Sequence, residues 1–272
     1  MTVEAFAKVN LSLEVLGLRP DGYHEIRSVV LPISLSDTLT LEPAPEGTVV
    51  SDSPYGDDDL AIRAARALLA AGAHGGVSIS TVKRIPAGGG LGGGSADAAA
   101  TLLALNEMWS SAKSPEELAA IGADVGSDVP SLVIAQFYRR PVLMEGRGET
   151  VRLLDDGETA ALGIGEFVVL ANPGVHSSTA EVYARCHAGS GGAQKCVNDL
   201  QAPACELHPE ITAALEALSA AGAKGVRMTG SGSTVFGFAD DAESASGISA
   251  KMADSGYASF VAKIRLSQSM PI

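Results

Sequence analysis

The chain has 272 residues, enough for one large or two modest domains with a buried core. Hydrophobic residues make up 46 % of it and charged residues 19 %, a balance that excludes a disordered tail. The 19 basic and 32 acidic residues give a formal net charge of −13, which disfavours nucleic acid and anionic membrane surfaces as partners.

Targeting and membrane signals are missing from the sequence pattern. No stretch reaches the roughly 18 apolar residues that a membrane span needs, and the opening MTVEAFAKVN lacks the basic and apolar regions of a secretory signal. We therefore predict a cytoplasmic protein whose partners are small molecules, with no expectation for its oligomeric state.

The three cysteines, Cys186, Cys196 and Cys205, are an odd number and contain no CxxC pair. A disulfide framework is therefore not expected. His187 and His208 lie nearby in the sequence and raise the alternative of a zinc site, but structural zinc sites usually draw their ligands from tight pairs. We predict no metal site in the protein itself.

The first half of the chain alternates strands and helices. Apolar residues recur at strand spacing or at helix spacing, and a turn at 19–22 separates the first two strands. The expected elements are strands at 4–16, 28–33, 38–41 and 76–84 and helices at 59–71, 98–105 and 115–121. A glycine turn at 146–148 closes this half.

The second half follows a different layout, with one strand–loop–strand hairpin around the loop 229–233. The expected elements are strands at 167–171, 225–228, 234–239 and 259–266 and helices at 179–186, 209–221 and 241–253. This pattern favours an α+β fold with a split βαβ arrangement. We expect two domains, residues 1–150 and 151–272.

The most informative stretch, PAGGGLGGGSAD at 86–97, has six glycines around Leu91. Without Cβ atoms, their backbone N–H groups can converge on an anion, and the N-terminus of the following helix adds partial positive charge. Ser95 is expected to cap that helix. The alternatives are a flexible loop, a Walker A motif and a dinucleotide fingerprint; the second lacks its Gly-Lys-Ser/Thr, and the third fits any run of glycines.

This loop resembles the ATP-binding motif of the GHMP kinases, the superfamily of galactokinase, homoserine kinase, mevalonate kinase and phosphomevalonate kinase. Further matching segments occur in the family's order along nearly the whole chain, which makes the combination specific. They are AKVNLSL at 7–13, RPDGYH at 19–24, GSDVP at 126–130, GRGE at 146–149, PGVH at 173–176, NDL at 198–200 and MTGSGS at 228–233.

The resemblance implies an α+β GHMP kinase fold, with an N-terminal ribosomal-S5-like domain, a C-terminal ferredoxin-like domain and the active site between them. It also implies a reaction: ATP-dependent phosphorylation of the 2-hydroxyl of a cytidine-diphospho sugar alcohol, in isoprenoid precursor biosynthesis by the non-mevalonate pathway. ATP would bind as its Mg²⁺ complex. The ATP-binding residues implied are Pro86, Ala87, Gly88, Gly89, Gly90, Leu91, Gly92, Gly93, Gly94, Ser95 and Asp59.

The catalytic residues implied by the resemblance are Lys8 and Asp128. A lysine near the γ-phosphate neutralises developing charge, and an aspartate can accept the substrate's hydroxyl proton. Taken singly, Lys8 reads as a solvated lysine of an edge strand and Asp128 as a turn or helix-capping residue. Asp124 lies in a similar local sequence, and only the following Val-Pro favours Asp128.

The substrate-binding residues are also implied by the resemblance. A nucleobase needs a stacking face and edge donors and acceptors, which aromatic and amide side chains supply. The implied contacts are Asn10, Tyr23 and His24 with cytosine, Thr179 with the diphosphate, Tyr183 with the second face of the base, and Gly230, Ser231 and Gly232 as a supporting loop. The same sequence pattern could also arise from a packed aromatic turn at 23–24, an amphipathic helix at 179–183 or a plain β-turn at 230–232.

Two segments depart from the family's pattern. Asp59 stands where an asparagine commonly reads adenine, and residues 136–140 replace a usual glycine pair. Two other functions remain open: another GHMP kinase of a small alcohol, in which Tyr23 and His24 have no nucleobase role, and a catalytically inactive ATP-binding regulator. The second would be marked by loss of Lys8 or Asp128, and both are present.

Overall fold

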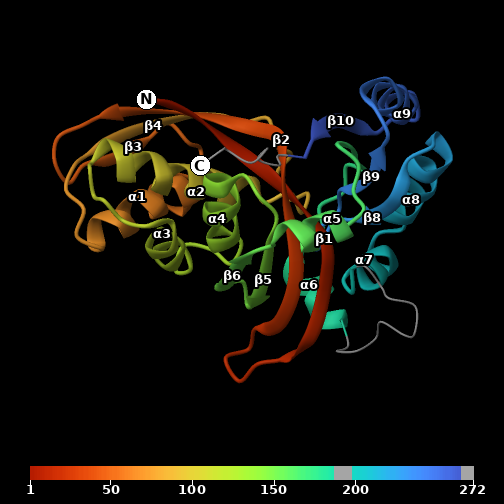
Figure 1. Cartoon of the computed structure of the whole chain (residues 1–272), viewed down its shortest axis with the longest axis horizontal. Helices are drawn as coiled ribbons and strands as arrows, with labels where there is room; N and C mark the ends of the chain where they lie inside the picture. The colour runs from red at the N-terminus through yellow and green to blue at the C-terminus, as the bar shows by residue number, and fades with distance from the viewer. Residues whose placement is uncertain (187–197, 265–272) are drawn as a thin grey trace.

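The computed structural model describes residues 1–186 and 198–264, in which the chain forms two β-sheets with helices packed against them (Figure 1). The first sheet contains β1 (Thr2–Leu18), β2 (His24–Pro43), β3 (Val49–Ser51), β4 (Val77–Val82), β5 (Val142–Gly146) and β6 (Thr150–Leu153). Its order is β3-β4-β2-β5-β6, with β1 paired to β2. The second sheet contains β7 (Phe167–Asn172), β8 (Lys224–Met228), β9 (Val235–Ala239) and β10 (Ala258–Lys263), in the order β10-β7-β9-β8.

The helices confirm the α+β class. Those of the first half are α1 (Leu60–Ala70), α2 (Gly93–Met108), α3 (Pro115–Gly122) and α4 (Val129–Tyr138). Those of the second half are α5 (Asp156–Ala161), α6 (Thr179–Arg185), α7 (Gln201–Leu207), α8 (Pro209–Ala221) and α9 (Ala242–Asp254). In the described ranges, none of these helices has the length and hydropathy that a membrane crossing requires.

Most elements expected from the periodicity are confirmed within two residues, but β2 is one strand of 20 residues where we expected two. The polar residues Ser36 and Asp37 lie between the two expected strands. Both are buried and hydrogen-bonded: Ser36 Oγ donates to Glu4 Oε1, and the Asp37 carboxylate accepts the backbone N–H of Ile85. A polar residue with a partner can lie inside a strand, so polarity alone did not mark a loop.

The hairpin of β1 and β2 joins the two halves of the chain. Its pairing runs from Thr2 with Thr40 to Leu18 with His24, and its tip projects as an arm beyond both sheets (Figure 1). Leu13 forms a β-bridge with Asn198 and Ile33 one with Ile264, so the hairpin contacts segments of the second half.

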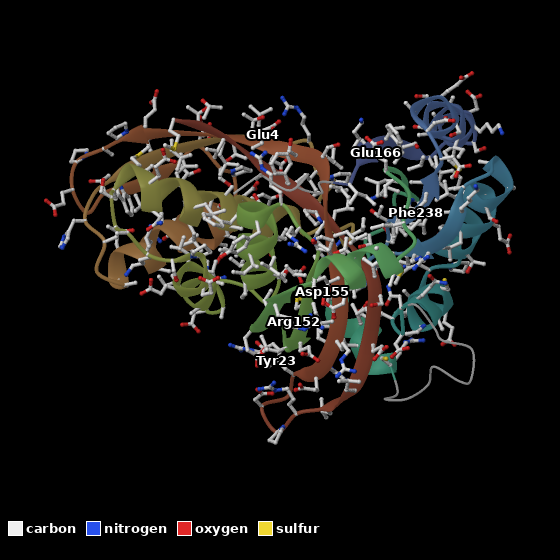
Figure 2. The ribbon with its side chains drawn as sticks, viewed as in Figure 1. Glu4, Tyr23, Arg152, Asp155, Glu166 and Phe238 are labelled. Atoms are coloured by element: carbon white, nitrogen blue, oxygen red, sulfur yellow. The ribbon has the colours of Figure 1, made fainter. Side chains whose placement is uncertain are left out.

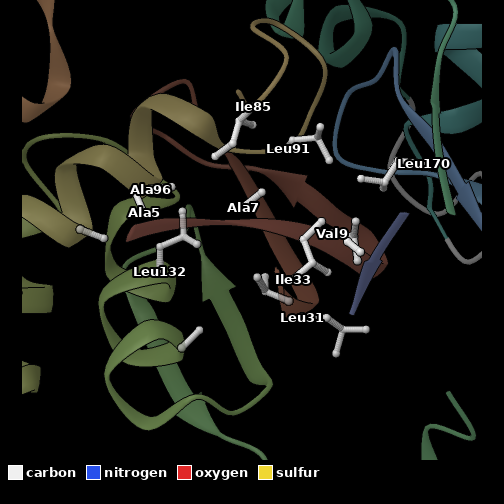
Figure 3. Packing of buried hydrophobic residues seen from close by; sticks show 14 of the residues in the cluster. Ala5, Ala7, Val9, Leu31, Ile33, Ile85, Leu91, Ala96, Leu132 and Leu170 are labelled. Atoms are coloured by element: carbon white, nitrogen blue, oxygen red, sulfur yellow. The ribbon is translucent and has the colours of Figure 1, made fainter. Parts of the chain in front are cut away.

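The hydrophobic core continues from one half into the other. Val9 and Ile33 of the hairpin, Leu91 of the glycine stretch and Leu170 of β7 are all buried in one cluster (Figure 3). The sheets separate between β6 and β7, near the boundary expected at residue 150. The division into two domains stays a prediction.

Several short elements were missed, among them β3, β5, β6, α5 and α7, as was the longer α4. Helix α4 is buried over Val129–Ala135, so it lacks the polar face that reveals an amphipathic helix. Pro130 lies in the first turn of α4, where proline is tolerated. Arg139 ends α4 with φ of 52°, a left-handed conformation in the segment where a glycine pair was missing.

Some expectations fall outside the described residues: His187, Cys196 and the end of the strand expected at 259–266. Cys186 is buried and Cys205 is partly exposed. Among the described residues, no group of three or more His, Cys, Asp or Glu side chains could hold a metal ion.

Candidate active site

The glycine stretch forms the N-terminus of α2 itself. The helix begins at Gly93, two residues before Ser95, and Gly92 occupies the cap position with φ of 70° and no side chain to cap it. The cap expected at Ser95 is therefore wrong, because a left-handed glycine already turns the chain into the helix. Gly88 and Gly90 also have positive φ, of 66° and 75°.

Two cavities meet at this loop. The larger cavity has a volume of about 760 Å³ and the smaller one about 520 Å³. Gly88, Gly90, Gly92 and Ser95 line both of them. A group bound at the loop can therefore be reached from either cavity.

The smaller cavity is lined only by residues between Asp52 and Asp97. All of the residues expected to bind ATP line it, from Pro86 to Ser95 together with Asp59. The Asp59 carboxylate accepts the backbone N–H of Ala61 at 2.7 Å and so caps α1. This capping role explains locally why an aspartate serves at that position.

A polar cluster at the wall of the smaller cavity joins two buried carboxylates to Lys83, whose side chain is 41 % exposed. Lys83 Nζ donates to Asp37 and to Asp97, the latter at 2.6 Å. Burial alone would lower the pKa of Lys83, but its hydrogen bonds to these carboxylates raise that pKa above the usual lysine value. Burial raises the pKa of Asp97 to about 7 against the opposing effect of Lys83, and Asp97 Oδ1 has no partner among the described residues.

Lys8 and Asp128 meet in the larger cavity, with Lys8 Nζ 3.2 Å from Asp128 Oδ2. Lys8 is 3 % exposed and Asp128 30 %, so the lysine is buried behind a carboxylate that solvent can reach. Asp128 precedes α4, but its side chain caps no backbone N–H. Asp124 is exposed and lines neither cavity, so the geometry favours Asp128 over Asp124.

Asn10 lines the larger cavity beside Lys8. It is 1 % exposed, and both ends of its amide are engaged: Oδ1 accepts Lys8 Nζ at 2.7 Å, while Nδ2 donates to Ser28 Oγ at 2.8 Å. Its backbone N–H donates to Thr229 Oγ1. These contacts hold Asn10 beside Lys8 and engage one of the two N–H donors of its amide. The role of Asn10 in reading cytosine stays a prediction.

His24 and Tyr183 come from the two halves of the chain and stack in the larger cavity. Their ring centroids are 4.9 Å apart and the planes differ by 30°. Burial, followed by the charge of Asp128, raises the pKa of the Tyr183 hydroxyl, which stays neutral. Tyr23 lines the same cavity from the tip of the hairpin arm, where it is exposed (Figure 2).

The loop 229–233 completes the wall of the larger cavity. Thr179 Oγ1 and Ser231 Oγ are 2.8 Å apart, and Ser177 Oγ donates to the Ser231 carbonyl at 2.7 Å. A Cβ on Gly90 would lie 2.2 Å from the Thr229 carbonyl oxygen, so the two loops pack backbone to backbone. Gly230, Ser231 and Gly232 all line the cavity, as expected.

Every site residue expected from the sequence therefore lines one of the two cavities. Lys83, Asp97, Arg147 and His176 also line them and were not expected. Arg147 lies in the GRGE segment at 146–149 and His176 in the PGVH segment at 173–176, so both could have been selected from their motifs. Asp97 is the last residue of the quoted stretch at 86–97, whereas Lys83 precedes that stretch and belongs to none of the quoted motifs.

Comparisons with known proteins agree on one family. A model of the GHMP kinases N terminal domain matches residues 59–136, and a model described as GHMP kinases C terminal matches residues 188–258. A 4-diphosphocytidyl-2-C-methyl-D-erythritol kinase of Symbiobacterium thermophilum is 40 % identical over 270 residues, covering 89 % of this chain and 92 % of that relative. One of Deinococcus radiodurans is 37 % identical, covering 96 % and 92 %.

Solved structures lead to the same result. The crystal structure of a 4-(cytidine 5'-diphospho)-2C-methyl-D-erythritol kinase superposes with a TM-score of 0.82 at 32 % identity, covering 98 % of this chain and all of that one. The mevalonate kinase of Methanococcus jannaschii gives 0.70 at 15 % identity, over 97 % and 98 % of the two chains, which shows a shared fold alone.

Proposed function

Because the chain belongs to the GHMP kinases and, within them, to the 4-diphosphocytidyl-2-C-methyl-D-erythritol kinases, we propose that it transfers the γ-phosphoryl group of ATP to the 2-hydroxyl of that substrate. The product would serve the non-mevalonate route to isoprenoid precursors. The proposal rests on the Lys8–Asp128 pair, which lies in the larger cavity. The glycine loop lines both this cavity and the smaller one.

The proposal assigns one substrate to each cavity. ATP occupies the smaller cavity, with its phosphates at Gly88–Ser95 and its base toward Asp59 and Lys83. The cytidylyl substrate occupies the larger cavity, with its base near Tyr23, His24 and Tyr183. Because four residues of the glycine loop line both cavities, the γ-phosphate and the acceptor hydroxyl can meet there.

Proton transfer falls to Asp128. Its carboxylate accepts the proton of the 2-hydroxyl as that oxygen attacks the γ-phosphorus, and ADP leaves. Lys8 remains protonated and stabilises the negative charge of the transferring group. Asn10 holds the ammonium through Oδ1, and Thr229 and Ser28 hold Asn10, so the lysine is oriented before the substrates bind.

Mg²⁺ is expected to arrive with ATP. In kinases this ion is usually held mostly by phosphate oxygens and water. Ser95, which lines both cavities, is the hydroxyl that would contact it. The ion would supply charge neutralisation at the β- and γ-phosphates.

The remaining expectations accompany this function. We propose that the partners are ATP and one phosphorylated cytidine derivative, with no nucleic acid, and that the protein works in the cytoplasm. The net charge of −13 supports the absence of nucleic acid as a partner, because it repels polyanions, and any anionic ligand must be bound by local geometry.

A side-by-side assay of acceptors tests the function. ATP consumption is measured with 4-diphosphocytidyl-2-C-methyl-D-erythritol, homoserine and phosphomevalonate under identical conditions. We expect turnover with the first alone, and loss of that turnover in Lys8→Met with the fold retained. Turnover of homoserine or phosphomevalonate in its place would favour another GHMP kinase activity, and no turnover with any acceptor would favour an ATP-binding regulator.

A further inference from the structure

Arg147 is a cation at the mouth of the larger cavity that the reaction has not yet used. It lies in the turn between β5 and β6, is half-buried, and lines the cavity. Its guanidinium carbon lies 5.2 Å from the centroid of the Tyr23 ring. Among the described residues, no ion pair joins Arg147 to a carboxylate, whereas neighbouring Arg19 is paired with three.

The turn that carries Arg147 contacts two parts of the wall of the larger cavity, near Asp128 and near Tyr23. On one side, Gly148 packs so closely that a Cβ there would lie 2.1 Å from the carbonyl oxygen of Ser127, the residue before Asp128. On the other side, Arg19 of the hairpin donates to Glu149 at 3.1 Å, and Arg147 covers the Tyr23 ring. Arg147 thus lies between the residue that would take the proton and the aromatic residue expected at the base.

The substrate has the same order of groups. Its diphosphate lies between the cytidine and the sugar alcohol that carries the 2-hydroxyl, and it brings at least two negative charges into a protein of net charge −13. Among the described residues, two Lys or Arg side chains line this cavity, Lys8 and Arg147. Lys8 is already engaged by Asp128 and Asn10, so Arg147, which is permanently charged, is the other cation available there.

We propose that Arg147 binds the diphosphate of the cytidylyl substrate and thereby selects phosphorylated over unphosphorylated cytidine compounds. This inference rests on the proposed function of the larger cavity. The Tyr23 ring orients the guanidinium, whose planar N–H groups can donate two parallel hydrogen bonds to one phosphate. Arg147 does not touch the attacking oxygen, so its contribution is to substrate binding and not to the chemical step.

The test compares Arg147→Gln with wild type in binding of cytidine, CMP and CDP, each by calorimetry. We expect the Kd of CDP to rise about tenfold or more, the usual value of a hydrogen bond to a charged group, while that of cytidine changes less than about twofold. KM for the kinase substrate should rise in parallel with CDP, with kcat and the KM of ATP unchanged. Arg147→Lys should retain part of the CDP affinity, because it keeps the charge but not the fork.

Arg152→Gln is the matched control. Arg152 lies on the adjoining strand β6, is paired with Glu158 and does not line either cavity, so the variant removes the same charge without touching the site (Figure 2). Unchanged CDP affinity in Arg147→Gln would overturn the proposal. Equal weakening of cytidine and CDP would also overturn it, because Arg147 would then act on the base through Tyr23. If wild type binds none of the three, the cytidine assignment of the cavity itself fails.

Discussion

The two cavities differ in how the chain builds them. The smaller cavity is lined by one continuous stretch, residues 52–97, whereas the larger one takes residues from Lys8 to Gly232 and hence from both halves. Local pattern alone could predict the first, because a glycine run followed by a helix is a recognisable anion site. The second is assembled by long-range packing, so its residues could be selected only by resemblance to a family.

The strongest way to test this comparison is to remove the chemistry and leave both cavities intact. Asp128→Asn keeps the size of the side chain but cannot accept the hydroxyl proton, so kcat should fall by at least about 10²-fold. The KM of ATP should stay near wild type, because Asp128 does not line the smaller cavity. Asp124→Asn is the control, since Asp124 is exposed and lines neither cavity. Normal turnover in Asp128→Asn with loss in Asp124→Asn would reverse the assignment.

A second variant acts on the loop that the cavities share. Gly92 has φ of 70°, and a Cβ there would lie 3.0 Å from Lys8 Cε. Gly92→Ala should therefore strain the start of α2 and displace Lys8, raising the KM of ATP about 30- to 100-fold and lowering kcat as well. Because Gly92 lines both cavities, the KM of the cytidylyl substrate should also rise.

Gly72→Ala separates backbone strain from the site. Gly72 has φ of 90°, has no atom within 4 Å of a built Cβ, and lines neither cavity. The Gly72→Ala variant should lose about 1 kcal/mol of unfolding free energy and should keep the ATP affinity of wild type. A comparable loss of ATP affinity in both variants would mean that strain, and not the phosphate site, explains the effect of Gly92→Ala.

How much could be predicted from the sequence also depends on whether a feature is built by a local stretch of chain or by long-range packing. The glycine stretch and the long amphipathic elements were found because their signal is local, and α4 was missed because a fully buried helix has no polar face. The contacts of the Asn10 amide with Ser28 and Lys8 could not be predicted from the sequence, because they depend on how β1 and β2 pair. Arg147 stood in a matching motif, but only the fold places it over Tyr23, 124 positions away in the sequence.

A third variant addresses the larger cavity alone. His24→Ala removes the ring that stacks on Tyr183 and, as proposed, a polar partner of cytosine. CDP binding should weaken by about 1 to 2 kcal/mol, the lower part of the range for a lost partner because this cavity is open to water. ATP binding should not change, since His24 does not line the smaller cavity. His74→Ala, at an exposed histidine outside both cavities, is the control; equal CDP affinity in all three proteins would remove His24 from the base site.

The smallest expected effect concerns the smaller cavity and depends on pH. Burial raises the pKa of Asp97 to about 7, above its value in the unfolded chain. The folded state therefore binds more protons than the unfolded state between the two pKa values, and the stability contributed by protonated Asp97 is lost as the pH rises through 7. From pH 6 to pH 8, wild type should lose about 1 kcal/mol of unfolding free energy from this group.

Urea unfolding across this pH range measures the effect. Asp97→Asn is nearly isosteric and carries no proton to lose, so its unfolding free energy should fall less between pH 6 and pH 8 than that of wild type. Asp58→Asn removes the same charge from an exposed position of the same cavity and should keep the wild-type slope. If Asp97→Asn keeps that slope as well, then Asp97 is ionised throughout, and Lys83 compensates two buried carboxylates at once. The smaller cavity would then present a fixed charge to ATP, and its continuous stretch of chain would carry no pH-sensitive group at Asp97.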